Sequence, residues 1–278
     1  MSGVVSPVHK LHALGAALAG LPGAVVAYSG GADSAFLAEV AYRRLGRRSV
    51  AVTADSASLP RRELAAAAGL AWSRGWRHRI VRTAELGDER YAANPLDRCA
   101  FCKSSLMDRL EPIARRLGVP VLIGTNLDDL GDWRPGQAVA TRRGARQPLV
   151  DAGFSKEEVR AASMVLGLRT AQKPASACLA SRIAYGVRVT ASALERVERA
   201  EDLLLARGFS VVRVRDLGGN RCRVEVGVDE VPRLEAWGED LVPELEALGF
   251  VQVELDRRGY RQGSLNEGAV HVELERVG

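Results

Sequence analysis

The 278-residue chain lacks any apolar run approaching the ~20 residues that a membrane-spanning helix requires. It also lacks a signal-peptide layout, because its most apolar N-terminal part leads directly into a glycine-rich turn of the fold. The net charge is +5, yet the chain has no long block of lysine and arginine. This charge suits an anionic ligand without requiring nucleic acid. We therefore expect a cytoplasmic protein of ordinary globular composition that binds neither membranes nor nucleic acid.

Cysteine is scarce, and the four cysteines at 99, 102, 178 and 222 are not expected to form a disulfide framework in such a chain. Cys99 and Cys102 have a Cys-x-x-Cys spacing that suits zinc, an iron–sulfur cluster or redox chemistry. Zinc would want two more ligands, but the sequence has no second pair of this kind and only His78 nearby. A thioredoxin-like redox site is disfavoured too, because the pair does not stand at the start of the helix in a thioredoxin-like βαβ unit. Two packed thiols at the start of a helix are the alternative.

The most informative segment of the chain is SGGADS at residues 29–34. It follows an apolar run at 24–28 and precedes a helical pattern that begins near Ser34. A strand, a turn of small residues and a helix together present free backbone N–H groups and a positive dipole end to an anion. The turn is not a Walker A loop, because no lysine follows Gly31. The alternative is a Gly-Gly turn that only connects a strand to a helix.

Short apolar runs alternate with helical stretches through the N-terminal part of the chain. We expect buried strands at residues 24–28, 49–54, 77–82 and 119–124, with helices near 34–45, 60–74 and 103–117. This alternation predicts an α/β fold with a doubly wound parallel sheet. Ligands bind beyond the carboxyl ends of the strands in such sheets, so the turn at 29–34, Thr53 and Gly124 should converge.

The pattern changes in the C-terminal part of the chain and predicts a smaller α+β domain. Residues 151–166 look helical with a start at Ser155, and Pro174 breaks the chain before Cys178. Beyond Thr190 we expect helices at 191–207 and 239–248, and strands at 209–215, 221–226 and 250–255, with a hairpin turn at 216–220. The expected domains are residues 1–188 and 189–278.

Cys178 stands among small residues and lies close in sequence to Lys173 and Arg182. A nearby cation favours the nucleophilic thiolate form of a cysteine. Together with Cys99 and Cys102, it also makes three cysteines that suit a cluster with one iron lacking a protein ligand. An open iron of that kind can hold an extra sulfide.

At these residues the chain resembles known proteins. SGGADS resembles the PP-loop of the ATP pyrophosphatases, which implies an adenine-nucleotide alpha-hydrolase-like fold. SGGADS, NPLDRCAFCK at 94–103, GTNLDDLGDWRPG at 124–136, ACLASRI at 177–183 and GYRQGSLNE at 259–267 are similar to the LarE family of sulfur transferases. The resemblance covers most of the chain. It implies that ATP adenylates a carboxylate of pyridinium-3,5-biscarboxylic acid mononucleotide, and that sulfur then displaces AMP to leave a thiocarboxylate for the nickel-pincer nucleotide cofactor.

The LarE family has two sources of sulfur. In one, the cysteine of the ACLASR motif, here Cys178, gives up its own sulfur and becomes dehydroalanine. In the other, three cysteines hold a [4Fe–4S] cluster that carries an additional sulfide. We favour a cluster on Cys99, Cys102 and Cys178, because sacrificial chemistry has no need of a Cys-x-x-Cys pair. The sacrificial role of Cys178 is the alternative, and the sulfide source is open.

The resemblance and the residue pattern together predict the nucleotide site, which comprises Ser29, Gly30, Gly31, Asp33, Ser34, Thr53 and Gly124. Asp33 is expected to help hold Mg²⁺, or else only to complement the helix dipole. Lys103 is expected to stabilise charge on the phosphates as a point cation, or else to be a solvated helix residue.

Residues after the last strand of the sheet are candidates for substrate binding. Asp129 and Arg134 are expected to orient the substrate or close the site, and Trp133 could stack on a pyridinium ring. Ser181 and Arg182 are also expected to bind the substrate. The alternative for the loop is local salt bridging.

Arg213 and Arg215 alternate on one expected strand and so share a face that suits a phosphate, here that of the mononucleotide. In the LarE family, matching arginines form a phosphate site near a subunit interface, which implies a homo-oligomer. The chain has Leu217 where the family usually has a histidine. A solvated strand face is the alternative, and Cys222 is interpreted as a small buried hydrophobe.

Other PP-loop enzymes are the competing interpretation. A tRNA-thiolating enzyme should have an RNA-binding module or basic stripe, which the C-terminal part does not clearly show. An amide-forming synthetase has no reason to carry the three cysteines. A non-catalytic nucleotide-binding or cluster-carrier protein would bind ATP without releasing pyrophosphate.

Overall fold

The computed structural model describes residues 7–131, 135–174 and 177–261, and it divides into two compact units. Unit 1 comprises residues 1–85 and 97–176, and unit 2 comprises residues 86–96 and 177–278. The sequence suggested a boundary after residue 188, whereas residues 177–188 belong to unit 2. Residues 86–96 join unit 2 as well, because the buried Asn94 side chain donates to the carbonyls of Ile183, Ala184 and Val187.

Unit 1 is built on a four-stranded parallel sheet in the order β3-β2-β1-β4. The strands are β1 (Ala24–Ala27), β2 (Ser49–Asp55), β3 (His78–Arg82) and β4 (Val121–Ile123). The helices of this unit are α1 (Pro7–Ala19), α2 (Ala32–Leu45), α3 (Arg61–Ser73), α5 (Arg98–Leu117), α6 (Pro135–Arg142), α7 (Pro148–Asp151) and α8 (Lys156–Val165). Parallel neighbours need crossovers, and the helices provide them.

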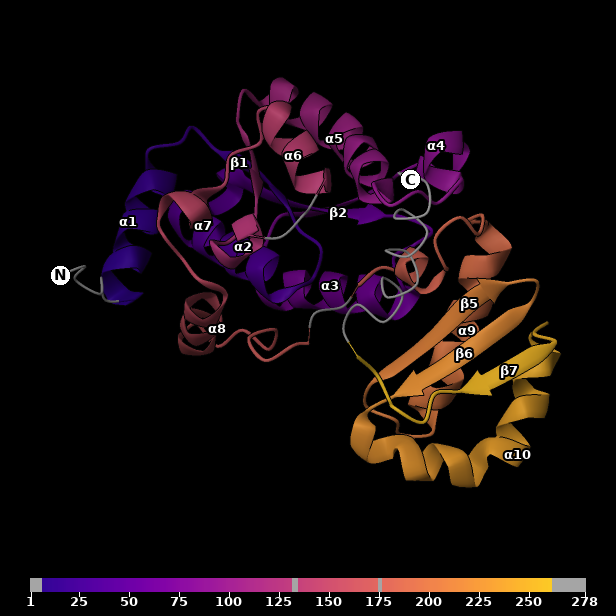
Figure 1. The fold of residues 1–278 in the computed structure, drawn as a ribbon. Helices are drawn as coiled ribbons and strands as arrows, with labels where there is room; N and C mark the ends of the chain where they lie inside the picture. Colours follow the sequence, from indigo (N-terminus) through magenta and orange to yellow (C-terminus); the bar gives the residue numbers. More distant parts are fainter. Residues whose placement is uncertain (1–6, 132–134, 175–176, 262–278) are drawn as a thin grey trace. The chain divides into compact units, whose positions relative to one another are not determined.

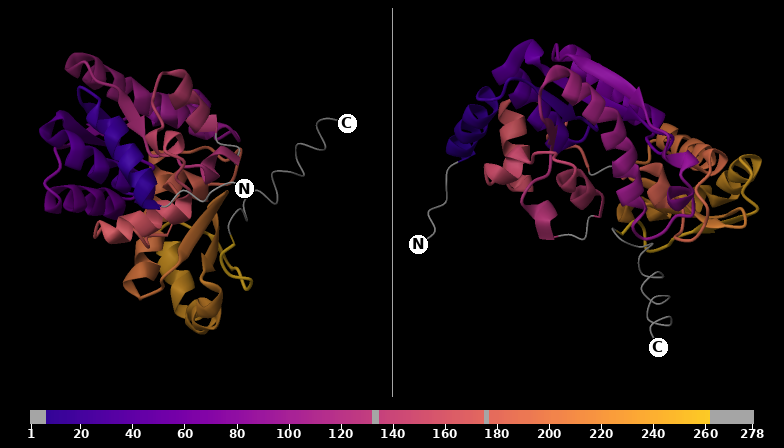
Figure 2. Two further views of the ribbon diagram at one scale, coloured as in Figure 1. Left: turned by 90° about the vertical axis from the view of Figure 1, so that its left-hand side faces the viewer. Right: turned by 90° about the horizontal axis from the view of Figure 1, so that it is seen from above.

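Helices cover both faces of this sheet. Val26 of β1 belongs to a core that includes Phe36 of α2 and Phe154, whose rings meet edge to face with centroids 5.3 Å apart. Val25 points to the opposite face and packs in a second core with Met107 of α5 and Ala140 of α6. Figure 1 shows α5 and α6 on one side of the sheet and α2 and α3 on the other, and Figure 2 shows the same layers from two further directions. The expected doubly wound parallel sheet is confirmed.

The element boundaries in unit 1 differ from the predicted ones in physically understandable ways. The expectation that β3 is a buried strand is wrong, because β3 is an edge strand and Ile80 is 48% exposed. Helix α5 begins at Arg98 rather than near residue 103, so the Cys-x-x-Cys pair lies in its first turns. The predicted helix at 151–166 is two helices, because Gly153 turns the chain with φ +73° and Ser155 starts α8 with a capping box.

Unit 2 holds α4 (Glu89–Ala92), α9 (Ala191–Ala206), α10 (Val231–Ala247) and a three-stranded sheet in the order β5-β6-β7. Its strands are β5 (Val212–Gly218), β6 (Arg221–Val226) and β7 (Gln252–Leu255), with β5–β6 antiparallel and β6–β7 parallel. The smaller α+β unit expected from the sequence is therefore confirmed. Helix α10 starts eight residues earlier than predicted, at Val231, because Pro232 is well tolerated in a first helical turn.

The two faces of the small sheet have different characters. Val214 and Val224 lie opposite each other and pack with Leu204 of α9 and Leu234 of α10. In the hairpin turn, Gly218, Gly219 and Asn220 all have positive φ. Arg213 and Glu225 lie opposite each other on the other face, which therefore carries charged side chains.

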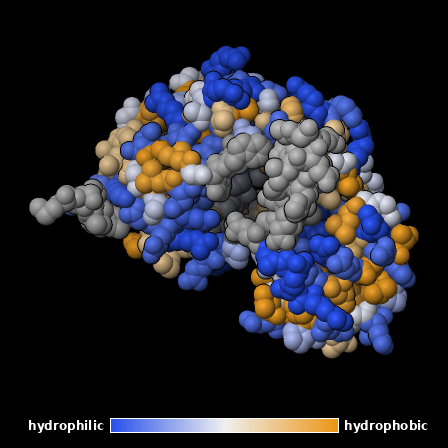
Figure 3. Space-filling view, viewed as in Figure 1, coloured by the Kyte–Doolittle hydropathy of each residue, from blue (hydrophilic) through white to orange (hydrophobic). Residues whose placement is uncertain are grey.

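The described residues contain no helix that is both long and apolar enough to cross a membrane. Hydrophilic residues cover most of the surface of each unit in the view of Figure 3, with smaller apolar areas between them.

Candidate functional site

The glycine-rich turn of unit 1 is held in shape by its own serines. The Ser29 N–H donates to Ser34 Oγ at 3.2 Å, and Ser34 Oγ donates to the Gly31 carbonyl, also at 3.2 Å. Gly30 has φ +79°, a conformation that L side chains rarely adopt. Gly31 caps α2 without a side-chain hydrogen bond, so the first N–H groups of the helix have no side-chain acceptor from this cap. These contacts fix the shape of the turn at a helix N-terminus, a type of place where anions commonly bind in proteins.

The ends of the neighbouring strands meet this turn as the sequence predicts. Thr53, at the end of β2, is fully buried and donates its hydroxyl to the Tyr28 carbonyl at 2.8 Å. A Cβ on Gly124, just beyond β4, would lie 2.9 Å from the Ser34 nitrogen. Gly124 thus permits the chain after β4 to approach the start of α2. Thr53 supports the backbone beneath the turn, because its hydroxyl is already engaged.

Three polar side chains gather at the carboxyl end of β4. The Asn126 N–H donates to Asp129 Oδ2 at 3.1 Å, and the Asp129 N–H donates to Asn126 Oδ1 at 3.2 Å. Burial, followed by the charge of Asp129, raises the pKa of Asp33, while Asn126 opposes that shift. Asp33 Oδ1 and Asn126 Nδ2 are buried without a hydrogen-bond partner. A cation beside Asp33 would relieve this arrangement.

The Cys-x-x-Cys pair occupies the first turns of α5. Cys99 is exposed, Cys102 is half-buried, and neither forms a disulfide. Burial lowers the pKa of Lys103, whereas negative charge on the Cys102 and Cys99 thiolates acts to raise it. A Cβ on Gly136 of α6 would lie 2.7 Å from the Cys99 carbonyl oxygen. Gly136 therefore lets α6 pack tightly against the start of the helix that carries the pair.

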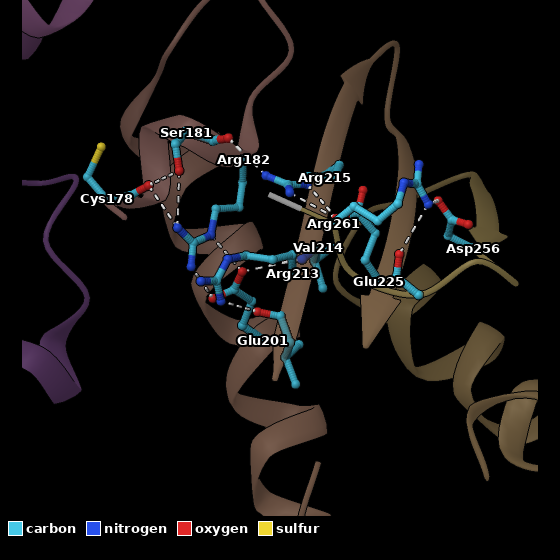
Figure 4. Close-up of polar contacts among 12 residues, drawn as sticks. Cys178, Ser181, Arg182, Glu201, Arg213, Val214, Arg215, Glu225, Asp256 and Arg261 are labelled. Atoms are coloured by element: carbon cyan, nitrogen blue, oxygen red, sulfur yellow. Dashed lines mark hydrogen bonds and ion pairs between the residues drawn. The ribbon is translucent and has the colours of Figure 1, made fainter. Parts of the chain in front are cut away.

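Cys178 of unit 2 lies at the start of a 3₁₀ turn over Leu179–Arg182 and is half-buried. Ser181 Oγ donates to the Cys178 carbonyl at 2.7 Å, and an Arg182 nitrogen donates to the Ala177 and Cys178 carbonyls at 2.6 and 3.1 Å. Arg182 also pairs with Glu201 of α9 at 2.8 Å. Figure 4 shows that the Cys178 thiol points away from the Arg182 guanidinium. Arg182 thus holds the backbone of the turn.

A cationic group lies next to this turn within unit 2. Arg215 donates to Glu225 at 2.9 Å and to the Ser181 carbonyl at 3.2 Å. Arg213 donates to the Val212 carbonyl, and its guanidinium lies 4.9 Å from the Tyr260 ring centre. Burial, followed by the charge of Arg182, lowers the pKa of Arg213. Figure 4 shows Arg182, Arg213 and Arg215 gathered on one side of β5. Such a concentration of guanidinium groups suits a phosphate.

The predicted site residues thus fall into three groups. Ser29, Gly30, Gly31, Asp33, Ser34, Thr53, Gly124 and Asp129 come together at the strand ends of unit 1. Cys99, Cys102 and Lys103 share the start of α5 in unit 1, and Cys178, Ser181, Arg182, Arg213 and Arg215 share unit 2. Arg134 and Trp133, together with Asp132 and residues 262–267 of the quoted motifs, lie outside the described residues.

Sequence reasoning missed Glu201 and the contacts of Lys173. Glu201 is fully buried at a helical spacing shared with Leu194, Val197 and Leu204. A glutamate in such an apolar row is the signal that could have identified it. The Lys173 ammonium, considered for its closeness in sequence to Cys178, binds the Gly30 carbonyl and Glu63 in unit 1.

Comparison with known proteins identifies the family of this chain. The chain is 34% identical over 267 residues to the pyridinium-3,5-bisthiocarboxylic acid mononucleotide synthase of Lactiplantibacillus plantarum. The alignment covers 95% of this chain and 96% of that protein. The chain belongs to the LarE family. No protein-family model matches the chain.

Two further relatives are uncharacterised proteins. One, from Synechocystis sp., is 45% identical over 247 residues, which are 87% of this chain and 91% of the relative. The other, from Methanocaldococcus jannaschii, is 24% identical over 174 residues, which are 62% of this chain and 68% of the relative.

The stretches that carry the LarE resemblance have defined places in the structure. SGGADS forms the turn before α2, and NPLDRCAFCK leads into the first turns of α5. ACLASRI forms the turn held by Arg182 and Glu201. Each of these stretches lies at a loop or a helix start, where backbone donors and thiols are accessible to ligands.

Proposed function

We propose that the chain is an ATP-dependent sulfur transferase that adenylates a carboxylate of pyridinium-3,5-biscarboxylic acid mononucleotide and converts it to a thiocarboxylate. The observation that carries this proposal is the preformed turn at 29–34, set at the strand ends beside the Asp33 carboxylate. The relative from Lactiplantibacillus plantarum, named for making the bisthiocarboxylic acid mononucleotide, supports the substrate and the reaction.

The turn is suited to the activation half of this reaction. In the proposal, its N–H groups and the serine hydroxyls bind the ATP phosphates, and the positive end of α2 stabilises the leaving pyrophosphate. A substrate carboxylate oxygen then attacks the α-phosphate, so that the oxygen–phosphorus bond forms as the bond to pyrophosphate breaks. AMP becomes the leaving group that a sulfur nucleophile displaces.

Asp33 fits the role of a Mg²⁺ ligand in this scheme. One of its carboxylate oxygens is buried without a partner, and the neighbouring Asp129 makes a second negative charge at that place unfavourable without a cation. Hard divalent cations prefer such oxygens. Bound Mg²⁺ would neutralise charge on the phosphates of ATP.

A [4Fe–4S] cluster on Cys99, Cys102 and Cys178 is our proposal for the sulfur source. None of the three thiols takes part in a disulfide among the described residues, and all three are at least partly exposed. Such a cluster supplies a site at which an additional sulfide can be held.

Arg213 and Arg215 are proposed to bind the phosphate of the mononucleotide. Arg215 is paired with Glu225, whereas Arg213 contributes a half-buried positive charge beside two further guanidinium groups. A dianionic phosphate would balance that charge. We also propose that the protein is cytoplasmic, and that it forms a homo-oligomer as the family resemblance implies.

Two measurements test the proposal on the full chain purified without oxygen. Pyrophosphate release from Mg-ATP should require the mononucleotide, and mass spectrometry should show a thiocarboxylate product. ATP binding without pyrophosphate release would overturn the enzymatic function. Iron and sulfide analysis tests the cluster. Absence of iron, together with loss of one hydrogen sulfide from Cys178 after turnover, would instead establish the sacrificial mechanism.

A further inference from the structure

Lys173 connects the turn at 29–34 to helix α3, two segments that lie far from it in sequence. Its ammonium donates to the Gly30 carbonyl at 3.0 Å and to a Glu63 carboxylate oxygen at 2.5 Å. The side chains of Lys173 and Glu63 are only 21% and 17% exposed. A partly buried cation between a carboxylate and a carbonyl makes charge-assisted hydrogen bonds, which are the stronger kind.

The contact with Gly30 determines the orientation of one peptide group. The peptide bonds of the described residues are not cis, so the carbonyl of Gly30 and the N–H of Gly31 point in opposite directions. When the Gly30 carbonyl faces Lys173, the Gly31 N–H must face away from it. Within the protein this N–H has a long contact of 3.4 Å with Ser29 Oγ. It is thus directed into the turn that the proposed function assigns to phosphate.

The other side of Gly30 is fixed by packing against α3. A Cβ on Gly30 would lie 2.9 Å from the Ala67 Cβ, and the Tyr28 hydroxyl donates to the Ala67 carbonyl at 3.2 Å. Glu63 lies in the first turn of the same helix. Gly30 therefore has contacts with both α3 and the ammonium of Lys173. The backbone there can rotate freely only if one of these contacts is lost.

We propose that Lys173 is a positioning residue for ATP: it holds the Gly30–Gly31 peptide with its N–H directed toward the bound phosphates. This inference rests on the proposed function in one respect, namely that ATP binds at the turn. Lys173 acts through the backbone of Gly30 and Gly31, and the Glu63 carboxylate holds its ammonium in place.

The chain contains a matched control for this residue. Lys10 of α1 donates to the Gly153 carbonyl at 2.6 Å and to Glu158 at 2.7 Å. The side chains of Lys10 and Glu158 are 18% and 21% exposed. Gly153 has φ +73°, compared with +79° at Gly30. Like Lys173, Lys10 thus bonds to a glutamate carboxylate and to the carbonyl of a glycine with positive φ. That pair supports the capping box of α8 rather than the turn at 29–34.

The experiment compares Lys173→Met with Lys10→Met in the full chain. Titration calorimetry measures Mg-ATP affinity, urea unfolding measures stability, and pyrophosphate release gives KM and kcat. Loss of a charge-assisted bond predicts about tenfold weaker Mg-ATP binding and a raised KM for Lys173→Met, with Lys10→Met within about twofold of wild type. Both variants should lose similar stability. Lys173→Arg, which keeps the cation, should recover much of the affinity.

Two results would overturn this inference. One is equal Mg-ATP affinity of the two methionine variants, which would leave Lys173 with a structural role only. The other is weakened binding that Lys173→Arg does not improve at all. If wild-type protein binds Mg-ATP but releases no pyrophosphate, the proposed reaction fails while the role of Lys173 in binding stands.

Discussion

Arg182 and Glu201 form an ion pair inside unit 2, with a nitrogen–oxygen distance of 2.8 Å and side-chain exposures of 1% and 0%. The same guanidinium holds the Ala177 and Cys178 carbonyls. Helix α9 therefore supports the turn that carries Cys178. A buried pair of this kind is costly to break from one side, because the remaining charge has no partner.

Glu201→Gln should destabilise the protein by about 3–5 kcal/mol, because it leaves the Arg182 charge buried and uncompensated. Glu89→Gln is the control, since Glu89 pairs with Arg188 at an exposed position of the same unit. That change should have little effect on stability, because water and salt screen an exposed ion pair. Urea unfolding checks both values, and similar midpoints for the two variants would contradict a special role for the buried pair.

Gly124→Ala should impair ATP binding as well as stability. The added methyl group would lie 2.9 Å from the Ser34 nitrogen and push α2 away from the end of β4. Gly69→Ala in α3 is the matched control, because a Cβ there meets no atom within 4 Å. That control should be neutral or stabilising by up to about 1 kcal/mol. Normal Mg-ATP affinity in Gly124→Ala would show that this close approach does not shape the site.

Stability should decrease as the pH falls, partly through His78. Burial lowers the pKa of His78 from its ordinary value of 6.5. The unfolded chain therefore binds a proton at His78 more readily than the folded chain does. The contribution of neutral His78 to the unfolding free energy is fully present above the pKa of the unfolded state, and it is lost as the pH falls below that pKa. The unfolding free energy of wild type should drop more between pH 8 and pH 5 than that of His78→Gln. Parallel pH profiles would contradict this assignment.

Thiol labelling should separate the cysteines by their surroundings. Burial raises the pKa of Cys222 to about 12, and the residue packs in the core of unit 2. Iodoacetamide at mildly alkaline pH should therefore modify Cys222 only after unfolding, because the thiolate is the reactive form. Exposed Cys99 should react in the native apoprotein. Peptide mass mapping gives the order, and early modification of Cys222 would refute its assignment to the core.

Arg213→Gln should raise the KM for the mononucleotide by about tenfold, since a charge-assisted contact to its phosphate would be lost. Mg-ATP affinity should stay unchanged. Arg223→Gln is a suitable control because Arg223 lies on the same face of the sheet but pairs with Glu254. Steady-state pyrophosphate release, measured with each substrate varied in turn, shows whether the KM for the mononucleotide rises while the KM for Mg-ATP does not. An equal effect of the two variants on KM would point to the charge of the whole face instead.

The sequence by itself determined the doubly wound sheet, the smaller α+β unit and the turn at 29–34. Those features follow from local rules, because apolar periodicity and glycine placement act within short segments. Convergence of Thr53 and Gly124 on that turn was predictable too, since parallel strands end at one edge of the sheet.

Only the tertiary structure decided which partners the charged residues have. Lys173 is close in sequence to Cys178, yet its ammonium binds Gly30 and Glu63. Arg182 was expected to bind the substrate, and the structure pairs it with Glu201, while β3 proved to be an exposed edge strand. Pairing depends on which long side chains folding brings together and removes from water. No spacing rule along the chain contains that information.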